Sequence, residues 1–278
     1  MKHKALAWIG VYALTIALLV VHRVEATALD DYVAKADLNY GYSLEATRVG
    51  PGYTVYAFDL TSQQWRSAAE VDRTLWQHEL LLAVPWSLHG GSEHTAILVV
   101  NGGSNKAGSS SNNDDALGLI AGAVGTVVAM VSQVPNQPLL FADQAAARAE
   151  DAILAYGMDK YLLTGDPEWL AQLPMTKAVV RAMDSIQDFA ANPGDVWPQP
   201  PRIDNFIVAG GSKRGWATWL TAAVESGAGG AARIKAILPA SIDLLNLGEQ
   251  FEHHWDAYGF YTTAIQDYVA FDLPCRSQ

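Results

Sequence analysis

Short apolar runs alternate along the chain with longer segments whose apolar positions recur at helical spacing. Strands are predicted at residues 53–59, 80–84, 96–100, 127–134, 206–209 and 233–239. Helices are predicted at 143–163, 175–191 and 214–225, and a further one is opened by Asp114 and Asp115. The run at 96–100 is aliphatic throughout, which is typical of a strand buried on both faces. Strands separated by helical segments predict one α/β domain, with a mainly parallel sheet and helices on both of its faces.

The first 28 residues have the pattern of a secretory signal peptide. Lys2 and Lys4 give a basic start, residues 5–21 are mostly apolar, and residues 26–28 (ATA) are small where a signal peptidase cleaves. An uncleaved membrane anchor is the alternative, because about 17 apolar residues reach the lower limit for crossing a bilayer. We expect cleavage after Ala28, a mature domain over residues 29–278, and a secreted, periplasmic or extracellular location without stable membrane insertion.

Composition and charge narrow the classes of protein. Half of the 278 residues are hydrophobic and 17% are charged, as in a folded globular protein. The 29 acidic residues outnumber the 18 Lys and Arg residues, and the net charge of −11 disfavours nucleic acid as a partner. Cys275 is the one cysteine, so the chain has no internal disulfide.

A serine lies between a predicted strand and a predicted helix. Residues 206–216 read FIVAGGSKRGW, which places Ser212 in the context of a nucleophile elbow. A glycine before the serine permits a strained backbone, and the helix N-terminus behind it favours negative charge. The spacing departs from G-x-S-x-G, since Arg214 stands two residues after the serine and Gly215 three. The residues alone leave two interpretations open, a nucleophile and a helix cap.

A second glycine-rich turn, NGGS at residues 101–104, directly follows the predicted strand 96–100. An α/β-hydrolase has at this position the loop that donates a backbone N–H to the oxyanion, and the other donor is then the N–H of Lys213. Alternatively the glycines only turn the chain. A phosphate-binding loop is excluded, because the glycine spacing at 103–108 is followed by Ser109 and Ser110 and not by lysine and a hydroxyl residue.

Residues His253, His254 and Asp256 are close enough in sequence to raise the question of a metal site. Three such residues without a second cluster are more typical of the solvated face of a helix. We therefore expect neither a metal nor a cofactor.

The serine turn GGSKRGW at 210–216 resembles that of the PhoPQ-activated pathogenicity-related protein family, which includes autocrine proliferation repressors of amoebae. Further matching segments follow in the same order, at 101–105, 133–138, 148–151, 174–178 and 237–246. The similarity extends from about residue 29 to about residue 273. It implies an α/β-hydrolase fold, with Ser212 as the nucleophile and Gly103 or Ser104 with Lys213 at the oxyanion hole.

The resemblance also reveals a departure at the C-terminal end. Members of this family continue through two further strands after 233–239, and in an α/β-hydrolase the acid and then the histidine follow the serine along the chain. Beyond Ser212, the candidates here are Asp243 as the acid and His254 as the base. We therefore expect a C-terminally truncated hydrolase-like domain in which the last strands are missing.

The function expected from these features is acyl hydrolysis by a secreted protein with a serine nucleophile. In full-length relatives the reaction is of the esterase or peptidase type, on an unidentified small-molecule or peptide substrate. We expect this chain to be inactive or weakly active. The alternative is a non-catalytic secreted binding or signalling protein on a hydrolase fold.

Overall fold

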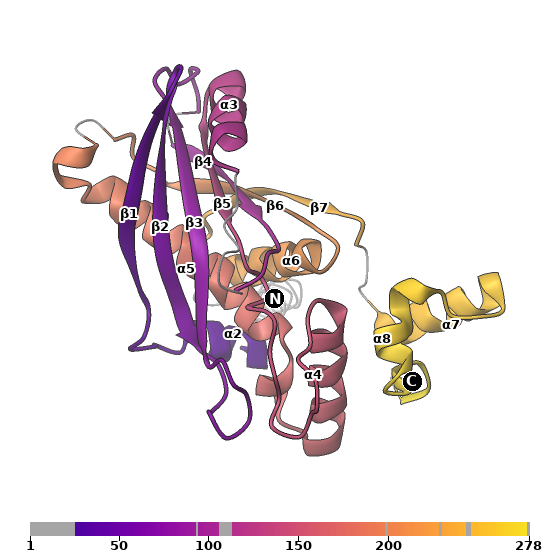
Figure 1. Ribbon diagram of the computed structural model, residues 1–278. Coiled ribbons are helices and arrows are strands. Elements are labelled where there is room, and N and C mark those ends of the chain that lie inside the picture. Colours follow the sequence, from indigo (N-terminus) through magenta and orange to yellow (C-terminus); the bar gives the residue numbers. More distant parts are fainter. Residues whose placement is uncertain are drawn as a thin grey trace, which may run out of the picture.

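The computed structural model describes residues 26–92, 94–105, 113–197, 200–227, 230–242 and 246–276. The described residues form one seven-stranded mixed β-sheet with helices on both faces (Figure 1). None of the helices in these ranges has the length and apolar character needed to cross a membrane. Most of the predicted signal segment, residues 1–25, lies outside the described residues.

The strands lie side by side in the order β1-β2-β3-β5-β4-β6-β7. Their bounds are β1 Gly41–Gly50, β2 Tyr53–Gln64, β3 Leu75–Pro85, β4 Thr95–Val100, β5 Val127–Val131, β6 Asn205–Gly211 and β7 Ile234–Ala240. The helices are α2 Ala28–Ala34, α3 Asp114–Val124, α4 Asp151–Thr164, α5 Gln172–Ala191, α6 Lys213–Ser226, α7 Leu247–Tyr258, α8 Gln266–Val269 and α9 Leu273–Arg276. Short 3-10 turns occupy Pro167–Trp169, Gly194–Val196 and Thr263–Ile265.

The sheet has an antiparallel half and a parallel half. Strands β5, β4, β6 and β7 are mutually parallel. Strands β1, β2 and β3 pair antiparallel with one another, and β3 is also antiparallel to β5. The prediction of a mainly parallel sheet therefore holds only for the second half. The connections between β1, β2 and β3 are too short for the helical crossover that a parallel pair requires.

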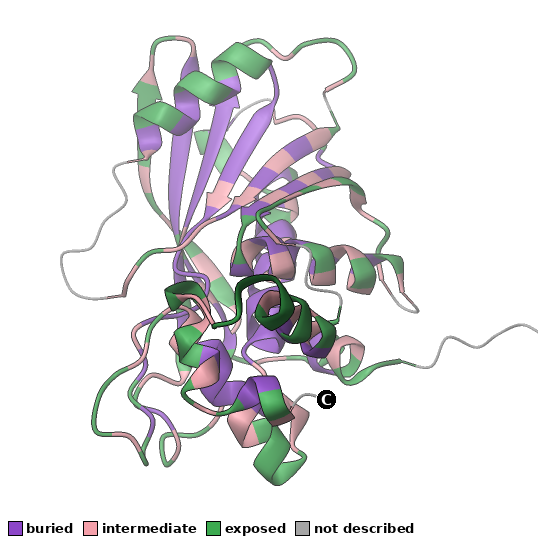
Figure 2. Cartoon of the chain, turned by 90° about the vertical axis from the view of Figure 1, so that its right-hand side faces the viewer, coloured by how far each residue is buried: buried purple, intermediate pink, exposed green. Residues whose placement is uncertain are grey.

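Alternating residues of β2 face two separate cores. Tyr56, Phe58 and Leu60 belong to the larger core, which contains residues of α5 and α6. Val55 and Ala57 belong to a smaller core, which is closed by residues of α3. The two-residue period of a strand thus produces helical layers on both faces, as the sequence predicts. Figure 2 shows buried and half-buried residues in the sheet, and in β4 and β6 the two classes alternate.

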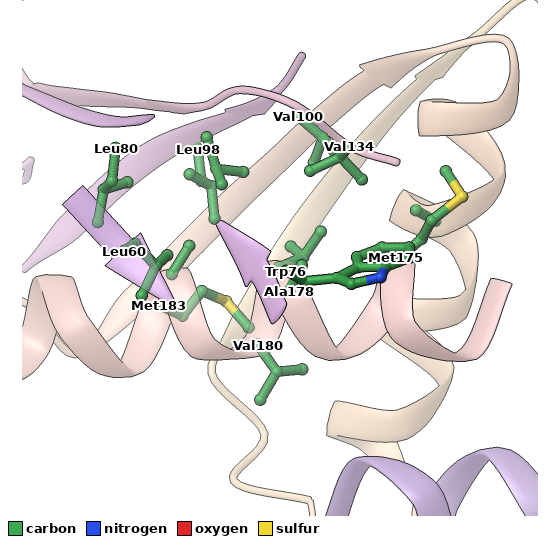
Figure 3. Close-up of a cluster of buried hydrophobic side chains, with 14 of the residues drawn as sticks. Leu60, Trp76, Leu80, Leu98, Val100, Val134, Met175, Ala178, Val180 and Met183 are labelled. Atoms are coloured by element: carbon green, nitrogen blue, oxygen red, sulfur yellow. The ribbon is translucent and has the colours of Figure 1, made fainter. Parts of the chain in front are cut away.

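Helix α5 supplies much of the larger core. Figure 3 shows Met175, Ala178 and Met183 on this helix beside Leu60 and Leu98 of the sheet. Met175, Ala178, Met183, Leu60 and Leu98 are all fully buried. The periodic apolar residues that predicted a helix at 175–191 therefore pack α5 against the sheet.

The C-terminal helices pack against α4, and β7 stays at the edge of the sheet (Figure 1). The Tyr268 hydroxyl of α8 donates to Asp151 at 3.0 Å, and Arg276 of α9 pairs with Asp159 at 2.6 Å. Within the described residues β7 pairs only with β6, and Leu238 on it is 60% exposed. Among the described residues the sheet thus ends at β7, which has no strand on its outer side and has an exposed apolar side chain.

Candidate active site

Ser212 occupies a sharp turn between β6 and α6. Its backbone has φ 53° and ψ −128°, a conformation that costs a non-glycine residue about 1–3 kcal/mol. Its N–H donates to the carbonyl oxygen of Ala240 in β7 at 2.8 Å, while its side chain makes no capping hydrogen bond to α6. Ser212 is exposed. The helix-cap interpretation therefore does not hold, and the strained, exposed serine matches a nucleophile elbow.

Two glycines allow the strand and the helix to approach closely at this turn. A Cβ atom on Gly210 would lie 2.5 Å from the carbonyl oxygen of Arg214. One on Gly215 would lie 2.4 Å from Ile242 and 3.0 Å from the carbonyl oxygen of Gly210. Gly215 thus provides the helix-to-strand contact, which explains why a glycine three residues after the serine is sufficient here.

The glycine loop follows the carboxyl end of β4, and the serine turn follows the carboxyl end of β6. These two ends lie side by side, because β4 and β6 are parallel neighbours. The Gly102 carbonyl accepts a hydrogen bond from the Gln133 N–H at 2.8 Å. In a trans peptide the C=O and the following N–H point in opposite directions, so the Gly103 N–H points away from Gln133. Gly103 itself has φ +125°, which favours glycine.

At the other half of the site, the Lys213 N–H is the first of α6 and has no acceptor within the helix. The structure places the predicted oxyanion residues Gly103, Ser104 and Lys213 on two neighbouring turns, at the carboxyl ends of β4 and β6. This is the arrangement that can hold an oxyanion between two backbone donors.

A charged network surrounds the turn, and sequence reasoning missed its centre, Glu150. The carboxylate of Glu150 accepts two hydrogen bonds from Arg214, both at 2.6 Å, and one from the Lys213 ammonium at 2.7 Å. Lys213, which is only 7% exposed, also pairs with Asp151 at 3.2 Å. Two adjacent cations at a helix N-terminus are unfavourable unless a negative charge lies near them. The sequence signal for an acidic residue at this turn was therefore the pair Lys213 and Arg214.

Glu150 remains ionised over a wide pH range. Partial burial alone raises its pKa, but the hydrogen bonds from Arg214, Lys213 and Gln137 outweigh burial and lower the pKa to about 2. The carboxylate of Glu150 therefore keeps its negative charge beside Lys213 and Arg214 at every pH at which the protein is expected to work.

An apolar cavity of about 470 Å³ lies along α6, beginning one turn after the serine. Trp216, Trp219 and Leu220 of α6 form one wall. Ile242, which also contacts Gly215, lines the cavity as well. A cavity of this size and character suits the apolar part of a small molecule.

The predicted acid and base are not brought to Ser212 by any contact in the described residues. Asp243 lies outside them. His254 lies on α7, where its Nε2 accepts a hydrogen bond from the Thr262 N–H at 3.2 Å, beside the ring of Tyr258. His253 is exposed on the same helix, and the described residues contain no group of three metal-ligating side chains.

A strained serine after one parallel strand and a glycine loop after its neighbour are the arrangement typical of the α/β-hydrolase class. The sequence profile of the PhoPQ-activated pathogenicity-related protein family matches residues 29–277. The chain belongs to this family, which confirms the resemblance seen in the sequence.

Known proteins similar to this chain include the autocrine proliferation repressor protein A of Dictyostelium discoideum, which is 36% identical over 254 residues. That match covers 91% of this chain and 48% of the relative, so the chain spans about half of the relative's length.

Similar solved structures include an acetyl xylan esterase from Paenibacillus sp. R4, with a TM-score of 0.48 and 14% identity over 92% of this chain and 75% of that one. A glucuronoyl esterase from Solibacter usitatus has a TM-score of 0.46 and 16% identity over 87% of this chain and 65% of that one.

Proposed function

We propose that this protein is a secreted serine acyl hydrolase of the esterase type. The observation that carries the proposal is the backbone of Ser212, which is strained, exposed and not used as a helix cap. A folded protein retains such strain where the surrounding structure and the function require it. In the reaction, the Ser212 hydroxyl attacks an ester carbonyl, and the N–H groups of Lys213 and Gly103 receive the developing oxyanion.

The substrate we propose is a small molecule or a peptide ester with an apolar portion. The cavity along α6 would receive that portion, since apart from Gln172 its lining residues are aliphatic or aromatic. The net charge of −11 disfavours polyanionic substrates.

Proton removal limits the rate in this chain. A serine hydroxyl is a weak nucleophile unless a neighbouring base accepts its proton. Within the described residues no carboxylate or imidazole accepts a hydrogen bond from Ser212. We therefore propose weak activity, carried by the oxyanion donors and binding, which alone give roughly 10³–10⁴-fold over water.

The test is covalent labelling by a fluorophosphonate probe, with the modified residue identified by mass spectrometry. We expect slow labelling at Ser212 and none in the Ser212→Ala variant. Ser226→Ala is the matched control, because Ser226 is an exposed serine of the same helix whose hydroxyl bonds to Ala222. Absence of labelling in the wild-type chain, or labelling that persists in Ser212→Ala, would contradict the proposal.

A second candidate function is signalling without catalysis, which the name and the 36% identity of the Dictyostelium relative favour. Purified protein would then slow the proliferation of Dictyostelium discoideum cells, and Ser212→Ala would do so equally. Loss of the effect in Ser212→Ala would instead assign it to the serine chemistry.

A further inference from the structure

The oxyanion hole proposed above is made of two chain segments that are distant in sequence, and one side chain joins them. Glu150 is the residue immediately before α4. Its carboxylate contacts Arg214 and Lys213 on the serine side, and Gln137 on the side of the glycine loop.

On the glycine side, Gln137 connects Glu150 to the loop. The side-chain amide of Gln137 donates to the carbonyl of Gly103 at 2.8 Å and to Glu150 at 2.5 Å. Its Oε1 in turn accepts the backbone N–H of Glu150 at 2.7 Å. Gln137 is 5% exposed, so these bonds are shielded from water. They fix the direction of the Gly103 carbonyl, and with it the Gly103–Ser104 peptide, which directly follows the peptide that carries the Gly103 N–H.

On the serine side, Arg214 makes the equivalent connection. Its two terminal nitrogens bind the Glu150 carboxylate in a bidentate pair, and its Nε donates to the carbonyl of Val134 at 2.6 Å. A Cβ atom on Gly102 would lie 2.6 Å from Nη2 of Arg214. The guanidinium therefore packs directly on the glycine loop, and the bidentate pair restricts its position in two directions.

Glu150 has a strained backbone conformation. It has φ 56° and ψ −132°, a conformation that a residue with a side chain adopts at a cost of about 1–3 kcal/mol. A carboxylate elsewhere on the first turn of α4 would serve the helix dipole without this strain. The strain is consistent with a requirement for this carboxylate at this point.

We propose that Glu150 is a positioning residue for the oxyanion hole, which holds the Lys213 N–H and the glycine loop at a fixed separation. This inference rests on the proposed function, since it concerns the same site. The role proposed for Glu150 is to position these donors and not to bind the substrate. It acts through Arg214 on one side and through Gln137 on the other, so that both backbone donors are preorganised when the oxyanion forms.

The experiment measures fluorophosphonate labelling of Ser212 in the full chain and separates reversible binding (KI) from the covalent step (kinact). The variant Glu150→Gln keeps the shape of the side chain but cannot accept both Arg214 hydrogen bonds and the Lys213 bond. We expect kinact to fall at least tenfold, towards the roughly 100-fold loss typical of a donor misplaced by about 1 Å, with KI changed less than threefold. The control Glu168→Gln alters a surface carboxylate that pairs with Lys35 and should leave both constants unchanged.

A second variant, Gln137→Met, guards against a Glu150→Gln chain that fails to fold. It breaks the glycine-side connection alone and leaves the Arg214 pair intact, so kinact should fall by about tenfold. The double variant should show less than the product of the two single losses, because both act through one network.

The outcomes distinguish the two proposals. If the wild-type chain labels at Ser212 and folded Glu150→Gln and Gln137→Met label with kinact within threefold of it, the positioning role is overturned and the serine site stands. A rise in KI with unchanged kinact also overturns it, since Glu150 would then shape binding. A wild-type chain that does not label at Ser212 overturns both.

Discussion

Ser212 and Glu150 adopt the same unusual backbone conformation, with φ and ψ of 53° and −128° in the first and of 56° and −132° in the second. Each residue directly precedes a helix, α6 and α4 respectively, and the two helices begin on opposite sides of one cluster of charges. The strained serine presents a hydroxyl, whereas the strained glutamate presents the counter-charge of the two residues that follow that serine. The turn at Ser212 is therefore joined, through the ion pairs of Lys213 and Arg214, to a second turn of the same shape.

Substitutions of Gly210 and Gly211 test whether β6 and α6 approach each other closely at the serine turn. Gly210→Ala places a methyl group 2.5 Å from a backbone oxygen, so we expect it to reduce the free energy of unfolding by about 2–3 kcal/mol. Gly211→Ala is the matched control, because a Cβ atom there meets no atom within 4 Å. Thermal unfolding measures both. The melting temperature of Gly210→Ala should fall by about 2–4 °C per kcal/mol, and equal melting of the two variants would show that the close approach is absent.

Stability should fall on acidification because of His78. This side chain is buried, its Nδ1 donates to the Ser132 carbonyl, and its Nε2 accepts from the Ser62 hydroxyl, so burial holds the ring neutral and lowers its pKa from 6.5 to about 4. Between these two values the unfolded state binds more protons than the folded state, and lowering the pH therefore favours unfolding. The contribution of neutral His78 to the free energy of unfolding is fully present above pH 6.5. It is lost as the pH falls towards 4, and the loss amounts to roughly 3 kcal/mol.

Urea unfolding of wild-type, His78→Gln and His253→Gln proteins between pH 7 and pH 4 tests this. The free energy of unfolding of His78→Gln should depend less steeply on pH over that interval. His253→Gln should behave as the wild type, since His253 is exposed on α7. Parallel pH profiles for wild type and His78→Gln would rule out the proposed titration.

The open edge at β7 should promote self-association. An unpaired strand edge with an exposed leucine invites pairing with another chain, and a lysine on such an edge opposes it. We expect light scattering to show that the wild-type protein associates and that Leu238→Lys shifts it towards monomer. Leu38→Lys, at a fully exposed leucine before β1, should change nothing. A wild-type chain that is monodisperse, with a cooperative melt above about 65 °C, would contradict this expectation.

The mature protein should begin at Leu29. In the structure Thr27 caps α2, exchanging hydrogen bonds with Asp30 in a capping box. Cleavage after Ala28 removes this cap and should cost the helix about 1 kcal/mol. N-terminal sequencing of exported protein decides the matter, because a terminus at Met1 on a membrane-bound protein would refute export with cleavage.

Much of the parallel half of the sheet was predictable because its strands have short aliphatic sequences. In the structure only alternate residues of β4 and β6 are buried, and β7 has no buried residue. Strand β1 was not predictable, since its exposed edge carries polar residues at alternating positions and no apolar run. The helix predicted at 143–163 begins only at Asp151. The preceding residues pair instead in a bridge between Leu139 and Arg148, a contact that local pattern cannot reveal.

At the site, local sequence was sufficient to place Ser212 on a turn between a strand and a helix and Gly103 on a loop after a strand, because each feature is formed by a few consecutive residues. Glu150 was not predictable in the same way. It lies 64 positions from Arg214, and its role depends on how α4 is placed against α6. Asp243 and His254 were predicted from chain order alone, and order does not determine distance.

The sharing of one carboxylate by Arg214, Lys213 and Gln137 also has a consequence for how sequences of this family diverge. Loss of Glu150 leaves a buried ammonium and a guanidinium short of counter-charge, while loss of Arg214 leaves a carboxylate held in a strained turn without its main ligand. We therefore expect single replacements at any of these positions to destabilise the site. Positions 137, 150, 213 and 214 should therefore be conserved together. In a homologue that lacks one of these side chains, we expect the other three to be replaced as well.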